Sequence, residues 1–123
     1  MPRTASKEGE LVKATIAFLK LIGVLAWRQN SGKAFTYVKF CGADGIGDVC
    51  GILPGGRFLS IECKKQGGRI RPNQTEFMEL VNKQGGLAFV AYDLGDVCRE
   101  VRAAISGDGI YTSPDAKTLN AKG

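Results

Sequence analysis

The stretch GDVCGILPGGRFLSIECK, residues 47–64, decides the fold of this chain. Residues 46–53 and 57–64 are rich in residue types that favour β-strands, and Pro54-Gly55-Gly56 between them suits a short turn. We therefore expect an antiparallel hairpin whose turn is centred on Gly55.

The hairpin predicts where its charged residues lie. Asp48 is seven residues before Gly55 and Glu62 is seven after it, so the two carboxylates should stand directly opposite each other. Their Cβ atoms would then be roughly 4.5–5.5 Å apart. Lys64 should project from the same face as Glu62, whereas Ile61 and its alternating neighbours point to the other face. The hairpin thus gathers three charged groups on one patch.

A helix is predicted over residues 6–22, with Ser6 as its cap and Gly23 after its end. Its apolar stripe is Leu11, Thr15, Phe18 and Ile22. One step back along the stripe lies Glu8, whose carboxylate should point toward the core side. The alternative is an ordinary helix N-terminal acid that the helix dipole favours.

The other predicted elements alternate between strands and helices. Residues 24–28, 34–40 and 87–92 are candidate strands, and the glycine-rich residues 41–47 are a candidate loop. A second helix runs from Pro72 to Gly85, with the buried stripe Gln74, Phe77 and Val81. A last helix is capped by Asp96 and buries Val97, Val101, Ala104 and Ile105. This order predicts an α/β domain with a mixed central sheet flanked by helices, over residues 1–112, and a polar, aperiodic tail over residues 113–123.

Composition narrows the class of protein. The 123 residues suffice for one domain, and no apolar run approaches the roughly 20 residues that span a bilayer, so we expect no membrane association. The N-terminus lacks the pattern of a secretory signal, which favours a cytoplasmic protein. The net charge of +5 favours a polyanionic partner. The chain contains no histidine, which excludes catalytic Ser-His and Cys-His pairs.

The four cysteines are Cys41, Cys50, Cys63 and Cys98. They lack the CxxC spacing of common zinc sites and sit mostly among apolar strand residues. We interpret them as reduced, buried thiols of a cytosolic protein, and an all-cysteine metal site remains open.

Facing carboxylates repel each other unless a cation holds them. Mg²⁺ prefers oxygen ligands and is commonly bound by one or two carboxylates together with a phosphate oxygen. Asp48 and Glu62 are therefore candidate ligands of Mg²⁺, or of Mn²⁺ in its place, and Lys64 would offset charge on a reacting phosphate. The alternative is that Glu62 and Lys64 form an ordinary solvated pair on an exposed strand face. The spacing of Asp48, Glu62 and Lys64 is by itself a weak pattern.

Residues near the hairpin extend the candidate site. Gln74 shares the buried face of its helix, although its amide could instead bond to the backbone near the helix start. The loop of residues 65–71 carries Lys65, Arg69 and Arg71, which are candidate DNA-binding residues or simply solvated cations.

Several motifs occur together in a specific order: Glu8-Gly9-Glu10-Leu11, the run from Trp27 to Gly32, Gly47-Asp48, the run from Pro54 to Phe58, Glu62-Cys63-Lys64, and Gln74. Over roughly residues 8–98 this set resembles the VRR-NUC (virus-type replication-repair nuclease) family of the PD-(D/E)xK superfamily. One departure is visible, because Gly47 stands where the family usually has proline.

The resemblance implies a restriction-endonuclease-like core with Asp48, Glu62 and the main-chain carbonyl of Cys63 as metal ligands. It also implies Lys64 as the catalytic lysine, with Gln74 and Glu8 as supporting site residues and Glu8 as a further candidate ligand. Ser31 and Lys33 are further candidate DNA contacts, beside the three cations of the loop. Small viral members look like homodimers that cut branched DNA such as four-way (Holliday) junctions, which suggests DNA repair in a bacterial or phage-infected cell.

Two other functions remain open. A restriction-type nuclease could use the same core, but the chain has little room for an elaborate recognition domain. A non-catalytic DNA-binding module would explain the basic loop, but it gives no reason for two facing carboxylates.

Overall fold

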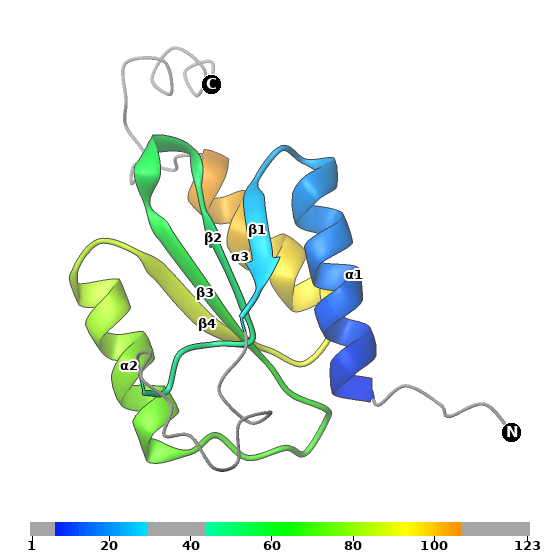
Figure 1. Ribbon diagram of the computed structural model, residues 1–123, viewed down its shortest axis with the longest axis vertical. Coiled ribbons are helices and arrows are strands. Elements are labelled where there is room, and N and C mark those ends of the chain that lie inside the picture. The colour runs from blue at the N-terminus through cyan, green and yellow to red at the C-terminus, as the bar shows by residue number, and fades with distance from the viewer. Residues whose placement is uncertain (1–6, 30–43, 107–123) are drawn as a thin grey trace, which may run out of the picture.

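Figure 1 shows the computed structural model, which describes residues 7–29 and 44–106. The elements in chain order are α1 (Lys7–Leu21), β1 (Leu25–Arg28), β2 (Val49–Ile52), the 3-10 turn η1 (Pro54–Gly56), β3 (Phe58–Cys63), α2 (Pro72–Lys83), β4 (Leu87–Ala91) and α3 (Leu94–Ser106). The predicted cap Ser6, the predicted strand over residues 34–40 and the predicted tail over residues 113–123 lie outside the described residues, as do Ser31, Lys33 and Cys41.

The described strands form one sheet in the order β1-β2-β3-β4. β2 pairs antiparallel with both β1 and β3, whereas β4 pairs parallel with β3. β3 and β4 can pair in parallel because α2, which connects them, carries the chain back to the end of the sheet at which β3 begins. This arrangement confirms the predicted mixed sheet with flanking helices.

The central hairpin has the predicted register. Val49 pairs with Ile61 and Ile52 with Phe58, so the two strands are symmetric about Gly55. Gly55 has a positive φ of 90°, a conformation that glycine adopts without the strain of a Cβ atom. One step beyond the last pair, Asp48 stands opposite Glu62. The register therefore brings together the two carboxylates that the sequence singled out.

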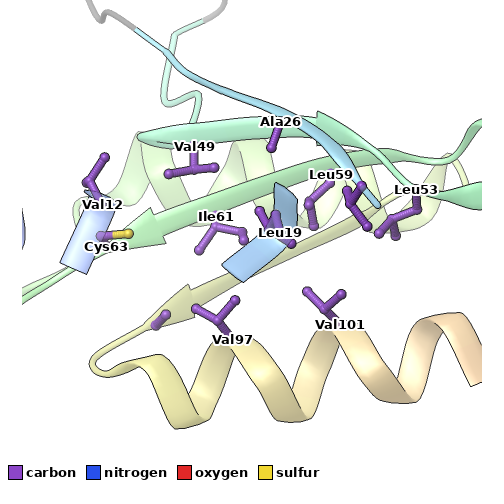
Figure 2. Close-up of a cluster of buried hydrophobic side chains, with 12 residues drawn as sticks. Val12, Leu19, Ala26, Val49, Leu53, Leu59, Ile61, Cys63, Val97 and Val101 are labelled. Carbon is purple, nitrogen blue, oxygen red and sulfur yellow. The ribbon is translucent and has the colours of Figure 1, made fainter. Parts of the chain in front are cut away.

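The main core lies on one face of the sheet, under α1 and α3 (Figure 2). Leu59, Ile61 and Cys63 of β3 all point to this face and are almost completely buried. Val97 and Val101 of α3 face them, as predicted. α2 covers the opposite face of the sheet, where residues of β3 alternate with the core residues.

Three details of the helices differ from the expectation. In α1 the fully buried apolar residues are Val12 and Leu19, beside the predicted Thr15. Ile22 is 36% exposed because α1 ends at Leu21. α3 begins before Asp96, and the side chain of Asp93 accepts the Asp96 N–H at 2.9 Å, so Asp93 rather than Asp96 is the cap.

None of the helices in the described ranges combines the length and apolar character that are needed to cross a bilayer.

Candidate active site

The candidate site lies where the start of β2 and the end of β3 meet the N-terminal ends of α1 and α2. In Figure 1 the start of β2 and the end of β3 meet near the centre of the view, the N-terminal ends of α1 and α2 lie below them on either side, and the loop between β3 and α2 passes between these two helix ends. The sheet and two helices thus bring Asp48, Glu62, Lys64, Gln74 and Glu8 to one end of the domain.

Asp48 is held by hydrogen bonds on its side chain and its backbone. Its Oδ2 atom accepts the Cys63 N–H at 2.9 Å, and its main-chain carbonyl accepts the Gln29 N–H at 2.7 Å. The Gly47 N–H donates to the hydroxyl of Ser60 at 3.0 Å instead of to a neighbouring strand. The ladder of β2 therefore stops at Val49, and β2 is shorter than the predicted 46–53.

Glu62 is a buried carboxylate with only 5% of its surface exposed. Its Oε2 atom accepts the side-chain N–H of Gln74 at 2.8 Å and lies 3.6 Å from Nζ of Lys64. Its Oε1 atom is buried without a hydrogen-bond partner. This burial excludes the alternative of a solvated pair on an exposed face, because the Lys64 side chain is also only 14% exposed.

Gln74 joins the site to the start of α2. Its Nε2 atom donates to Glu62, and its Oε1 atom accepts the N–H of Arg71, just before the helix, at 2.9 Å. Both interpretations of Gln74 from the sequence are therefore correct, since one amide caps the helix and holds a site carboxylate.

Glu8 reaches the site from the first turn of α1. Its Oε2 atom accepts the N–H of Lys65 at 3.2 Å, which ties α1 to the loop that follows β3. Its negative charge also acts on Asp48. Glu8 thus supports the site from its edge, and its role as a metal ligand stays a prediction.

The carboxylates perturb each other. Burial raises the pKa of Glu62 to about 7, and the negative charge of Asp48 adds to this rise. Burial also raises the pKa of Asp48, against the Cys63 N–H and the charge of Lys64, which lower it. Burial is thus the main reason why both carboxyl groups are harder to ionise here than in water.

The donor set fits a hard divalent cation. Asp48 and Glu62 supply carboxylate oxygens, and Glu62 Oε1 is a buried acceptor that no protein group satisfies. The Cys63 backbone lies against Asp48, so its carbonyl stays a candidate third oxygen. Among residues 7–29 and 44–106, no three Cys, Asp or Glu side chains gather as a metal site, which leaves an all-cysteine site without support there.

Of the five candidate DNA contacts, three lie within the described residues. Lys65, Arg69 and Arg71 are exposed and lie in the segment between β3 and α2, and the positive charge of Arg71 acts on Glu62. The described residues also form a groove lined by Phe58, Phe77 and others near the end of α2. None of the candidate site residues Asp48, Glu62, Lys64, Gln74 and Glu8 lines this groove, so it is not the site.

Comparisons with known proteins address the fold. The sequence matches no family model. It also matches no curated protein at a significant level. Two solved structures are similar. One, described as a VRR_NUC domain, has a TM-score of 0.60 at 23% identity and covers 80% of this chain and 97% of its own.

The other solved structure, a VRR_NUC domain protein, has a TM-score of 0.61 at 21% identity and covers 85% of this chain and 92% of its own. The chain has the fold of a VRR_NUC domain. This likeness confirms the fold that the sequence resemblance implied.

Ser60 was not among the predicted site residues, yet its buried hydroxyl accepts the N–H of Gly47, the residue before Asp48. The alternation of side chains along a strand could have placed Ser60 on the same face as Glu62, because the two residues are two positions apart. A serine in a strand is too common for that signal to stand out.

Proposed function

We propose that the protein is a metal-dependent endonuclease that hydrolyses phosphodiester bonds in DNA. The observation that carries the proposal is the pair of the half-buried Asp48 and the buried Glu62, which converge beside Lys64 with the Glu62 Oε1 atom unsatisfied. The VRR_NUC fold supports it.

Each residue of the site has a distinct task in this proposal. Asp48, Glu62 and the Cys63 carbonyl would hold Mg²⁺ or Mn²⁺, which when bound polarises the scissile phosphate and lowers the pKa of a water. Gln74 fixes Glu62 in place through its 2.8 Å hydrogen bond. Lys64 places its ammonium beside the carboxylates, where it can orient the attacking water or offset charge on phosphorus.

The DNA backbone would lie along the loop between β3 and α2. Lys65, Arg69 and Arg71 are exposed there and can contact phosphates on either side of the scissile bond. Phosphate contacts fix the position of DNA but carry no sequence information. The proposed enzyme therefore selects DNA by its shape and not by its sequence. The resemblance to small viral VRR-NUC proteins supports branched DNA such as four-way junctions as its substrate and a homodimer as its active form.

A non-catalytic DNA-binding module explains the site less well. Two facing carboxylates, once ionised, would repel a phosphate unless a cation lay between them. A pure binding surface has no need to bury Glu62 and brace it with Gln74.

The proposal is tested with a panel of end-labelled DNAs: linear duplex, flap, splayed arm and four-way junction, each incubated with the protein in Mg²⁺ and in Mn²⁺. We expect cleavage of the panel, fastest on the branched members. Binding of DNA without cleavage of any member would favour the non-catalytic module. Rapid cutting of the plain duplex at one sequence would favour a restriction-type nuclease.

A further inference from the structure

Asp48 enters the site from a segment without regular structure, residues 44–48, so something must fix its approach. The contact that does so is the hydrogen bond from the Gly47 N–H to Ser60 Oγ, at 3.0 Å. Gly47 and Ser60 are both buried, so water does not replace this bond.

Gly47 lies so close to β3 that it leaves no space for a side chain. A Cβ atom at this position would stand 2.7 Å from the carbonyl oxygen of Ile61 and 2.7 Å from Ser60 Oγ. Proline would bring the same clash and would also lack the N–H that Ser60 accepts. Gly47 therefore packs directly against β3, because it has no side chain and because its N–H donates to the hydroxyl of Ser60.

Ser60 is suited to this task by its position. It is 1% exposed and lies two residues before Glu62, on the same face of β3. Its hydroxyl also hydrogen-bonds to the thiol of Cys50, its partner across the hairpin. The hydroxyl is thus held between two strand residues while it accepts the Gly47 N–H.

We infer that Ser60 is a positioning residue for Asp48, an inference that rests on the proposed metal site. Asp48 is then fixed at three points: its carboxylate by Cys63, its carbonyl by Gln29, and its preceding residue by Ser60. In this chain the Gly47–Ser60 contact supplies the rigidity that a proline before the aspartate would otherwise give.

The geometric half of the inference is tested without metal, by amide NMR on wild type, Ser60→Ala and Val101→Ala. In Ser60→Ala the Gly47 amide should exchange at least roughly tenfold faster. The Cys63 amide, which reports on Asp48 directly, should shift toward its position in Asp48→Ala. Val101→Ala removes buried core atoms from α3 and should leave the Cys63 shift unchanged, and it should speed exchange of the Gly47 amide no more than that of other buried amides. An unchanged Cys63 amide in Ser60→Ala would overturn the inference.

The functional half is tested by calorimetric titration of the same proteins with Mn²⁺. Ser60→Ala should weaken Mn²⁺ binding by roughly tenfold or more, whereas Val101→Ala, which is also destabilising, should change it by less than about twofold. Equal affinity in wild type and Ser60→Ala would overturn the role of Ser60. Failure of wild type itself to bind Mn²⁺ would instead contradict the proposed function, and the NMR result would still decide whether Ser60 positions Asp48.

Discussion

Lys64 stands at the boundary between the buried carboxylate of Glu62 and the surface. Its ammonium is 3.6 Å from Glu62 Oε2, and its side chain is 14% exposed. This position suits a group that acts on the reacting phosphate more than one that holds DNA.

Replacement of Lys64 by alanine should therefore separate chemistry from binding. We expect Lys64→Ala to reduce cleavage by roughly 100-fold or more. Its DNA affinity, measured in Ca²⁺, should stay within about threefold of wild type, since one phosphate contact among several contributes little. Lys83→Ala, at the far end of α2, is the matched control and should keep both properties. Equal loss of cleavage and affinity would make Lys64 a binding residue.

Glu62 should make the stability of the metal-free protein depend on pH. Its pKa is about 7 in the folded protein, against an ordinary value of 4.5. Between these values the folded carboxyl keeps a proton that the unfolded one has lost. Stability should therefore fall as pH rises through this window and level off above pH 7, by on the order of 3 kcal/mol.

Denaturant unfolding at pH 5 and pH 8 measures this effect. Wild type should lose stability between the two pH values, and Mg²⁺ should restore it at pH 8. Glu62→Gln removes the titrating group and keeps an acceptor for Gln74, so it should lose much less stability. Parallel behaviour of the two proteins would show that Glu62 is not the group that titrates.

At the scale of elements, the hairpin was predictable because its information is local. The Pro54-Gly55-Gly56 turn fixes the register, and the register fixes Asp48 opposite Glu62. Gln74 was predictable for a similar reason, because helical periodicity places it on the buried face of α2.

Contacts between distant segments were not predictable from periodicity. The choice of Val12 and Leu19 as the deepest residues of α1 depends on how that helix packs on the sheet. The predicted cap of α3 was Asp96, but the observed cap is Asp93. Either aspartate could cap a helix, and the earlier one does so because the chain turns directly after β4. The contact between Gly47 and Ser60 links residues 13 positions apart and leaves no pattern in the sequence.

The loop between β3 and α2 should supply backbone contacts to DNA. Arg69→Ala combined with Arg71→Ala should weaken binding similarly on unrelated sequences and reduce the slope of log affinity against log salt by about 1–2. Salt titrations of binding on two unrelated duplexes and one junction measure both quantities.

The control for this loop is Lys20→Ala combined with Lys83→Ala, which removes two exposed cations from the last turns of α1 and α2. Its net charge equals that of the arginine variant, yet its salt dependence should stay close to that of wild type. A change in sequence preference in the arginine variant would contradict a role limited to the backbone.

At the scale of the whole molecule, one domain with one candidate site can cut one strand at a time. Paired cuts in a four-way junction require two sites, and a twofold-symmetric dimer is the commonest way to provide them. Sedimentation at micromolar concentration should therefore show a dimer.

Mixing tests whether the dimer pairs its sites. Wild type mixed with excess Asp48→Asn should leave single nicks in a junction plasmid that wild type alone cuts twice. A monomer in sedimentation that still makes paired cuts would contradict the dimer.

The central claim is that Asp48 and Glu62 form a metal-dependent site that cuts DNA. The most direct measurement is the rate of cleavage of a labelled four-way junction as Mg²⁺ is raised and then removed with EDTA. It compares wild type with Asp48→Asn and with Glu76→Gln, which neutralises an exposed acid on α2. Wild type and Glu76→Gln should cut in proportion to bound Mg²⁺ and stop in EDTA, while Asp48→Asn should not cut. Undiminished cleavage in EDTA, or by Asp48→Asn, would contradict the claim.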